Sequence, residues 1–299
     1  MKYFFSLILF LFISFYANAQ KDSTIKILIV TAHPDDETGF AATVYKVTKE
    51  LHGIADQCVI TNGEGGYKYS TLSESYYNLE LTDEKIGREN LPRIRKQELM
   101  NAGKIIGMRN IFFLDQKDAH YGLDEHEPLD TTWNVSLVAT RLKEIMTKTK
   151  YDFVFCLLPT PETHAHHKAA SLLALRTIQS LPIEQRPIIL GVTGANKNDT
   201  TKYSFSQLKD YKESKVDGNG PMYYFDKSVK FGFKNALSYK IIVNWEIAEH
   251  KSQGTMQLAM NQGDLEQFWY FSLNGEIGKE KCQQFFERLK IIPYLPKSY

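Results

Sequence analysis

The sequence of 299 residues has few cysteines and no excess of charge of either sign, and both shortages exclude classes of protein. Its three cysteines, Cys58, Cys156 and Cys282, are an odd number, so they cannot form a complete disulfide framework. None is spaced from another as metal-binding cysteines are, and Cys58 and Cys156 lie in apolar runs where a buried, unreactive thiol is expected. Lysine and arginine number 36 against 35 aspartate and glutamate, so the chain lacks the positive field that attracts nucleic acid.

Glycine and proline are not abundant either, at 18 and 10 residues, which excludes a collagen-like or a low-complexity chain. Hydrophobic residues make up 43% and charged residues 24%, the balance of a globular protein. We find no internal repeat, no linker and, beyond residue 20, no apolar run of the length that a membrane span needs. Residues 20–299 are therefore expected to form one globular domain, with no membrane span in the mature chain and no nucleic-acid partner.

The first 19 residues have the layout of a secretory signal peptide. Lys2 supplies the positive charge, an apolar run extends from Phe4 to Tyr16, and Ala17-Asn18-Ala19 fits the small-x-small cleavage signature. The apolar run is shorter than the approximately 20 residues of a spanning helix. We expect cleavage after Ala19 and a secreted or periplasmic protein, with an uncleaved N-terminal anchor as the alternative.

From Thr24 onward, short apolar runs alternate with segments of helical periodicity, the pattern of an α/β protein. Strands are expected at residues 25–31, 57–61, 111–114, 153–158 and 188–192. Helices are expected at residues 40–51, 94–106, 135–148 and 166–178, and a late strand at 239–243 is expected to lead into a helix from about residue 246. The predicted fold is a Rossmann-like, mostly parallel sheet with helices on both faces.

Two connections, residues 64–92 and 195–220, are too long to be simple turns. Both follow a predicted strand, so both should open at the carboxyl edge of the sheet, where ligands bind in open α/β folds. The second connection has few apolar residues that could anchor it. We expect it to border the site as a mobile lid or specificity loop, with a disordered insertion as the alternative.

The first chemically active cluster is His33-Pro34-Asp35-Asp36-Glu37, placed where the first strand ends and the first helix begins. A histidine nitrogen and an aspartate oxygen are both normal zinc ligands, and residues three apart at such a turn can meet one ion. The alternative is that Asp35 or Asp36 only caps the helix. Two adjacent carboxylates beside a histidine exceed what a cap requires.

The second cluster, residues 159–167, again separates a strand from a helix and holds three of the chain's 8 histidines. His164 and His167 are three positions apart and can face the same side, whereas His166 should point elsewhere. A catalytic zinc ion uses three protein ligands and keeps one position open. His33, Asp36 and one histidine of this cluster would supply three, and an incidental polar loop is the alternative.

Two other segments favour ordinary structural roles. Residues 124–127 (Asp-Glu-His-Glu) look like a set of ligands but are expected to form a solvated acidic loop, because no strand edge places them. The aromatic run 268–271 could stack on a sugar, but aromatic residues in a helical pattern are expected to belong to the core.

Further motifs follow these clusters in a fixed order along the chain. They are Ala32–Glu37 (AHPDDE), Gly63-Glu64-Gly65-Gly66, a helix with Arg95 and Glu98 that ends at Ile106-Gly107, Asp118 after the third strand, His164–His167 and His250-Lys251-Ser252-Gln253. In this order the sequence resembles the PIG-L/LmbE-type deacetylases over most of the mature chain. Members of that family are zinc-dependent and remove the acetyl group from N-acetylglucosamine-containing substrates.

The resemblance implies a role for each matching residue. It implies that His33, Asp36 and His167 bind one zinc ion. Asp35 would be the general base, and His164 would face the developing oxyanion. The substrate would contact Glu64, Arg95 and Asp118, while His166 and His250 would lie around the ligands. Without the resemblance, Arg95 and Glu98 would be read as a surface ion pair worth a few tenths of a kcal/mol.

The chain departs from the family at one position. Many members have aspartate immediately before the second histidine of the His164–His167 motif, where this chain has His166. A neutral imidazole supplies no fixed negative charge, so the ligands stay intact but the charge state of His164 is open.

The expected function is therefore a zinc-dependent hydrolysis of an acetamido sugar, glycan or glycolipid outside the cytoplasm. A catalytically silent sugar-binding relative is one alternative, although Asp35 and a complete ligand set argue against it. A zinc amidase that acts on a non-sugar acyl amine is the other.

Overall fold

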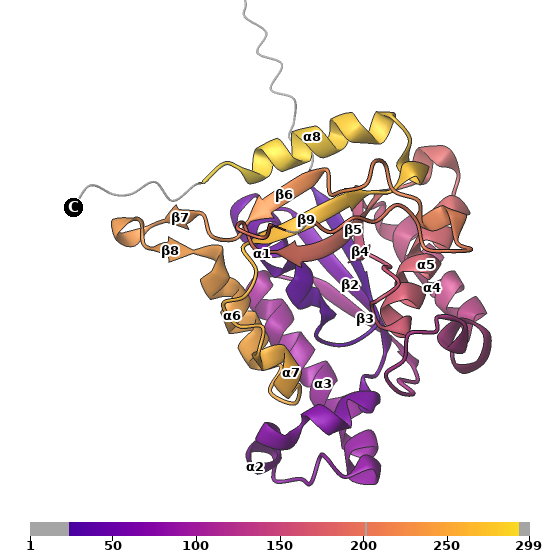
Figure 1. The fold of residues 1–299 in the computed structure, drawn as a ribbon, viewed down its shortest axis with the longest axis vertical. Helices are drawn as coiled ribbons and strands as arrows, with labels where there is room; N and C mark the ends of the chain where they lie inside the picture. Colours follow the sequence, from indigo (N-terminus) through magenta and orange to yellow (C-terminus); the bar gives the residue numbers. More distant parts are fainter. Residues whose placement is uncertain (1–23, 201, 293–299) are drawn as a thin grey trace, which may run out of the picture.

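The computed structural model describes residues 24–200 and 202–292, so the predicted signal peptide and its cleavage site lie outside the described residues. A seven-stranded sheet with the order β3-β2-β1-β4-β5-β9-β6 forms the centre (Figure 1). Its strands are β1 (Lys26–Thr31), β2 (Ile54–Thr61), β3 (Asn110–Gln116), β4 (Phe153–Leu157), β5 (Ile188–Ala195), β6 (Tyr223–Asp226) and β9 (Leu265–Tyr270). The first five run parallel, while β9 is antiparallel to both β5 and β6.

Helices cover both faces of the sheet, which confirms the predicted fold class (Figure 1). Side chains of β1 alternate between the two layers: Leu28 and Val30 pack with α4 (Val135–Thr149) and α5 (Ala165–Gln179). Ile27 and Ile29 belong to the opposite core. That core includes residues of α1 (Ala41–Tyr45), α3 (Glu84–Ile106), α6 (Tyr239–Glu249) and α8 (Ile277–Leu289). A strand buried on both faces explains why the sequence is continuously apolar there.

The helix predicted at residues 94–106 begins ten residues earlier, at Glu84. Pro92, taken as the end of a loop, lies inside α3, and the Asp83 side chain caps the helix by accepting a hydrogen bond from the Ile86 backbone N–H. Gly107 ends the helix at φ 78°, a left-handed conformation that glycine adopts without strain.

The C-terminal third departs from the sequence prediction. The strand expected at residues 239–243 is wrong, because this segment is the start of α6. The run 268–271 is buried as expected, but it lies mostly in β9 and not in a helix. Short apolar runs fit either element, and only pairing with the distant strand β5 decides between them. A small hairpin of β7 (Lys230–Phe231) and β8 (Leu237–Ser238) precedes α6.

The two long connections differ in their relation to the site. The first contains η3 (Glu64–Tyr69), η4 (Thr71–Ser73) and α2 (Glu74–Tyr77), and it lines the cavity described below. The lid expected at residues 195–220 is wrong, because none of the described residues of this segment, 195–200 and 202–220, lines that cavity. Four of its side chains are instead buried in the core with Trp269, namely Phe205, Leu208, Tyr211 and Val216.

Among the described residues, no helix is long and apolar enough to span a membrane. All three cysteines are buried and free of disulfides. Burial raises the pKa of each thiol to about 12, which keeps the thiols protonated and unreactive, as predicted for Cys58 and Cys156.

Candidate active site

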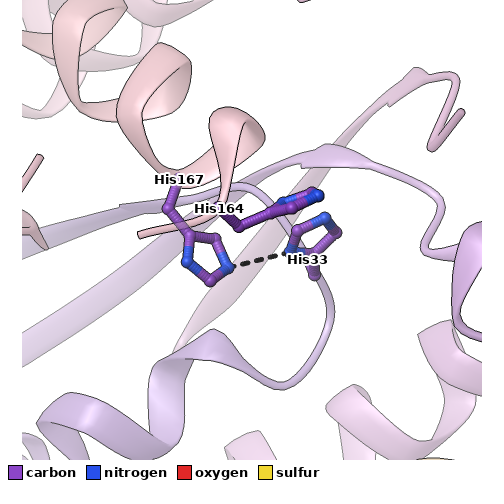
Figure 2. Close-up of side chains that lie close together, drawn as sticks. All are labelled: His33, His164 and His167. Carbon is purple, nitrogen blue, oxygen red and sulfur yellow. Dashed lines mark hydrogen bonds between the residues drawn. The ribbon is translucent and has the colours of Figure 1, made fainter. Parts of the chain in front are cut away.

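Two loops meet at the carboxyl ends of the neighbouring parallel strands β1 and β4. His33 and Asp36 follow β1, and Asp36 opens the short helix η1 (Asp36–Phe40). His164 and His167 follow β4, at the start of α5. The sheet extends from β1 to β3 on one side and from β4 to β5 on the other, so these loops lie where ligands bind in open α/β sheets. Figure 2 shows the three imidazoles of this site converging.

Three donor atoms lie close enough to bind one metal ion. Nδ1 of His33 is 3.1 Å from Nε2 of His167 and 3.6 Å from Oδ1 of Asp36, and the latter two atoms are 3.0 Å apart. Tetrahedral zinc with bonds of about 2.0–2.1 Å separates its ligand atoms by about 3.3 Å. The mutual distances of His33, Asp36 and His167, which we call the ligand triad, therefore fit a cation of this size.

Hydrogen bonds orient two members of the triad. The backbone N–H groups of Ala32 and His33 donate to Oδ2 of Asp36 at 3.0 and 2.8 Å, which leaves Oδ1 to face the imidazoles. Nδ1 of His167 lies 3.2 Å from the hydroxyl of Thr163, so its Nε2 is directed to the triad. Asp36 thus uses its carboxylate for the site and does not cap the helix that it opens.

The electrostatics of the site favour a positive charge. Burial alone would lower the pKa of His33, but Asp36 and Asp118 outweigh it and raise this pKa to about 9. Burial would raise the pKa of Asp36, yet His167 and His33 hold it well below its ordinary value. A buried cluster that stabilises protonated imidazole in this way is suited to a cation.

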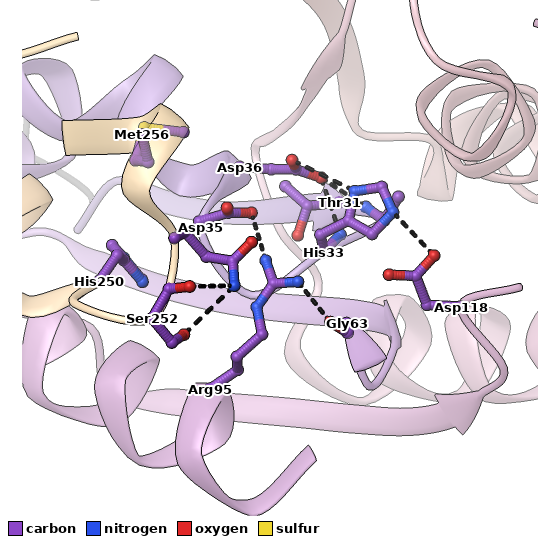
Figure 3. A network of polar contacts seen from close by, with 12 residues as sticks. Thr31, His33, Asp35, Asp36, Gly63, Arg95, Asp118, His250, Ser252 and Met256 are labelled. Atoms are coloured by element: carbon purple, nitrogen blue, oxygen red, sulfur yellow. Dashed lines mark hydrogen bonds and ion pairs between the residues drawn. The ribbon is translucent and has the colours of Figure 1, made fainter. Parts of the chain in front are cut away.

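Asp35 lies beside the triad and pairs with Arg95 of α3 (Figure 3). Nη2 of Arg95 is 3.0 Å from Oδ1 of Asp35, and the two side chains are 3% and 13% exposed. Nη1 of Arg95 donates to the backbone carbonyl of Gly63 at 2.6 Å. Asp35 makes no capping hydrogen bond to η1, so its carboxylate also serves the site and not the helix.

Arg95 therefore holds Asp35 in place, while its contact with substrate stays a prediction. The surface ion pair between Arg95 and Glu98, which their spacing alone would favour, is not formed. Both partners are buried, and Glu98 accepts hydrogen bonds from the backbone N–H and hydroxyl of Ser252 at 2.8 and 2.6 Å. These bonds join α3 to the segment after α6 that begins with His250.

His164 caps the other side of the site. Its Nε2 lies 3.1 Å from the carbonyl oxygen of His120, so this nitrogen carries the proton. Nδ1 has no hydrogen-bond partner within the described ranges. Burial and the neighbouring His33, His166 and His167 lower the pKa of His164 to about 3, so the ring is neutral in the metal-free site.

Asp118 and His166 lie behind His33. Oδ1 of Asp118 is 3.8 Å from Nε2 of His33 (Figure 3). The same oxygen is 3.3 Å from Nδ1 of His166. Burial would raise the pKa of Asp118, but the two histidines and Arg95 hold it well below its ordinary value. Asp118 also borders the cavity, so its predicted substrate contact remains open. The prediction that His166 points elsewhere is wrong, because its ring lies 4.5 Å from that of His164 and its Nδ1 faces Nε2 of His33 at 3.2 Å.

The remaining predicted residues lie outside the cavity lining. Glu64 is half-buried in η3, and burial raises its pKa. His250 is fully buried, and its Nε2 lies 2.5 Å from Oε1 of Glu37, the residue that follows the triad aspartate. His250 thus braces η1 against α6 and acts on the site only through Glu37.

A cavity of about 540 Å³ opens onto the triad. Its wall includes Gln253 of the late His250–Gln253 motif. It also includes residues that no sequence motif marked, namely Tyr67, Lys68, Tyr69, His120 and Tyr121. Tyr121 is 67% exposed, and its ring stacks on that of His164 with centroids 4.9 Å apart. No spacing signal marked these residues, since they come from loops that only the fold brings together.

The prediction of a solvated loop at residues 124–127 holds for Asp124 and His126 only. Glu125 pairs with the buried Lys168 at 2.8 Å, and Glu127 is half-buried. His126 is exposed and pairs with Asp130. Glu127, however, places Oε2 3.5 Å from Nε2 of His166. No sequence pattern predicts this contact, because Glu127 and His166 are far apart along the chain.

Comparison with known proteins agrees with this geometry. Residues 28–178 match the family model described as PIG-L, GlcNAc-PI de-N-acetylase, and this segment holds the triad, Asp35 and His164. The match covers half of the chain. The chain belongs to the PIG-L family.

Relatives at the level of sequence are distant. The chain is 25% identical over 166 residues to a probable N-acetyl-α-D-glucosaminyl L-malate deacetylase 2 of Bacillus cereus, which covers 56% of this chain and 66% of the relative. The corresponding protein of Bacillus subtilis is 24% identical over 161 residues, with 54% and 64% covered. The matches thus span just under two thirds of these relatives.

A solved structure with a similar fold is the 4-carboxy-2-hydroxymuconate hydratase of Pseudomonas putida. It is 12% identical, with a TM-score of 0.51, and the alignment covers 82% of this chain and 95% of that one. This likeness shows the fold alone. Because this neighbour carries a different activity in its name, function has to be argued from the site.

Proposed function

We propose that this protein is a zinc-dependent hydrolase that removes the N-acetyl group from an N-acetylglucosamine-containing substrate. The observation that carries the proposal is the ligand triad, whose donor atoms lie 3.0 to 3.6 Å apart at the base of a cavity beside Asp35. Zinc bound there would acidify a water molecule and polarise the amide carbonyl.

Asp35 is the proposed general base. It neighbours the triad residue Asp36 in sequence and lines the same cavity, so its carboxylate is placed to take a proton from water and to return it to the departing amine. The ion pair with Arg95 engages only one carboxylate oxygen, Oδ1. Arg95 thereby fixes the direction of the carboxylate without occupying its second oxygen through this pair.

His164 is the proposed partner of the developing oxyanion. Since Nε2 is committed to the carbonyl of His120, Nδ1 is the nitrogen that would meet the substrate. In the neutral ring, which the lowered pKa of His164 favours, that nitrogen is an acceptor, so stabilisation of an oxyanion requires the ring to take up a second proton as the oxyanion forms.

The cavity wall supports a sugar as the substrate. Tyr67, Tyr69 and Tyr121 supply aromatic surface, and Lys68 and Gln253 supply hydrogen-bond donors. Flat aromatic rings beside polar groups suit a ring that is apolar on its face and polar at its edge. The names of the Bacillus relatives, which are probable deacetylases of an N-acetylglucosaminyl compound, point to the same substrate class.

We also propose that the mature protein works outside the cytoplasm, on the basis of the signal-peptide layout of residues 1–19. Cell fractionation followed by N-terminal sequencing tests this proposal. A mature protein in the periplasm or medium that begins at Gln20 supports it, and a full-length chain in the cytoplasm contradicts it.

The test of function is a deacetylation assay on purified protein with quantified metal. The panel contains N-acetylglucosamine, its disaccharide, several N-acetylglucosaminides and an acetylated amine that is not a sugar, with released acetate as the readout. Acetate release from sugars that depends on zinc and on Asp35 supports the proposal. Turnover of the non-sugar amide alone would favour the amidase alternative, and binding of sugars without turnover would favour a silent relative.

A further inference from the structure

His166 is a fully buried imidazole that has no part in the proposed chemistry. Its Nδ1 lies 3.2 Å from Nε2 of His33 and 3.3 Å from Oδ1 of Asp118. Its Nε2 has no hydrogen-bond partner within the described part of the chain, and the nearest carboxylate, that of Glu127, is 3.5 Å away. Because polar atoms face both nitrogens of this buried ring, the position of its ring proton decides which nitrogen donates a hydrogen bond and which accepts one.

The ligand triad determines that arrangement. A cation bound by Nδ1 of His33 requires that this nitrogen present its lone pair, so the remaining ring proton sits on Nε2. That N–H lies nearer to Nδ1 of His166, with Nε2 at 3.2 Å, than to Oδ1 of Asp118, at 3.8 Å, so Nδ1 of His166 is the unprotonated acceptor and donates no hydrogen bond to Asp118 in this arrangement. The proton of His166 consequently sits on Nε2, beside the carboxylate of Glu127.

We infer that His166 is a positioning residue for the metal ligand His33. It accepts the Nε2–H of His33, which fixes the tautomer and the orientation of the ligand ring, while Asp118 and Glu127 supply the negative charge that a neutral imidazole lacks. Metal-bound histidines commonly donate their second N–H to a carboxylate or carbonyl. Here the imidazole of His166 lies between the ligand His33 and the carboxylate of Glu127.

This inference rests on the proposed function only in taking the triad as a metal site. A different arrangement of the same atoms is a second metal ion bound by His33, His166 and Asp118, whose donor atoms lie within 4.8 Å of one another. That arrangement requires His33 to lose both ring protons and to bridge two ions. The single-ion arrangement needs no such step, and the number of ions per chain separates the two.

The experiment measures zinc affinity and stoichiometry on metal-free protein by competition with a chromogenic chelator. His166→Phe keeps a planar ring but removes the acceptor, and it should weaken binding about 10- to 100-fold. His166→Asp, which restores an acceptor, should bind within a few-fold of wild type. Glu127→Gln keeps the shape of a half-buried side chain, so it folds even if His166→Phe does not, and it should weaken binding by a smaller factor.

Trp133→Phe is the matched control. Its ring packs 5.2 Å from that of His166 but takes no part in the hydrogen-bond chain, so zinc affinity should not change. Melting temperatures confirm that each variant is folded. The cobalt-substituted proteins add a spectroscopic readout of ligand geometry, which should change in His166→Phe and not in Trp133→Phe.

Three results would overturn the inference. The first is wild-type zinc affinity in folded His166→Phe, or in Glu127→Gln if the former does not fold. The second is two ions per wild-type chain with one lost in His166→Phe, which would make His166 a ligand. The third is a wild-type protein that binds no zinc, which would overturn the proposed function as well. Absence of deacetylation with the predicted order of affinities would refute the proposed function and leave the inference standing.

Discussion

Replacing Asp35 with asparagine separates two properties of this carboxylate, its proposed basicity and its ion pair with Arg95. The substitution keeps the shape of the side chain and all three members of the ligand triad, so the metal content should not change. Loss of a general base typically lowers turnover by about 10²–10⁴-fold. At 1.36 kcal/mol per factor of ten, this corresponds to about 2.7–5.4 kcal/mol in the activation barrier.

The same substitution has a cost in stability that can be predicted from the structure. Arg95 is only 3% exposed, and Asp35 is the acidic partner within 3.0 Å of it. Removing one member of a buried ion pair costs about 3–5 kcal/mol, a figure that the 13% exposure of Asp35 reduces. Asp35→Asn should therefore also lower the melting temperature, and the assay must be run well below it.

Arg95→Gln is the comparison that divides the two effects. It breaks the same ion pair but keeps the carboxylate, so it should lower stability as Asp35→Asn does and lower kcat much less. The double variant should be destabilised by less than the sum of the two. Arg93→Gln, on the exposed side of α3, is the control and should change neither quantity. Wild-type kcat in metal-replete Asp35→Asn would refute the role of Asp35 as the general base. Equal losses of kcat in Asp35→Asn and Arg95→Gln would assign the chemistry to the Asp35–Arg95 ion pair.

Three further predictions concern other parts of the molecule. Burial and the neighbouring Glu37 raise the pKa of Glu246 well above its ordinary value, so the charged carboxyl opposes folding at every pH above its unfolded pKa. Glu246→Gln should therefore raise the free energy of unfolding at pH 7 by about 1–3 kcal/mol, with a gain that shrinks as the pH falls from 7 towards about 4.3 and vanishes below it, where the carboxyl is neutral in both states; equal gains in urea titrations at about pH 7 and about pH 4 would contradict this. Tyr121→Ala should raise KM for sugar substrates several-fold with little change in kcat, and an unchanged KM would remove Tyr121 from the binding surface. Phe205→Ala should cost about 3–5 kcal/mol of stability and leave KM unchanged below the melting temperature, because Phe205 anchors its segment in the core and not at the cavity. A change in substrate range would instead support a lid role for residues 195–220.

The first two thirds of the fold could be predicted because each strand there is a continuous apolar run and each helix has its own period. The run at residues 25–31 predicts β1 to within one residue. The C-terminal third could not be predicted, because its elements are defined by partners far away in sequence. Residues 239–243 become helical only where α6 packs against α1 and α3, and residues 265–270 become a strand only by pairing with β5.

The site shows the same division. His33, Asp36 and a histidine of residues 164–167 could be predicted because both motifs follow strands whose carboxyl ends meet at one edge of a parallel sheet, and the resemblance to the family selected His167. Arg95 pairs with Asp35 and not with its helical neighbour Glu98, and Glu127 approaches His166. Both contacts depend on the paths of loops, which no local sequence pattern predicts. Side chains that contact the triad from a distance in sequence are therefore visible only in the folded protein.

The central claim is that His33, Asp36 and His167 bind one divalent ion. Elemental analysis of the purified wild-type protein and of His33→Ala, Asp36→Ala and His167→Ala tests it directly, with His126→Ala, whose ring is 64% exposed and away from the site, as the control. Zinc is the metal that the ligand set favours, although affinity order alone would allow another transition metal to replace it. The account predicts one equivalent per chain in wild type and in His126→Ala and a loss of the ion in each triad variant. A full complement of metal in all three triad variants would contradict it.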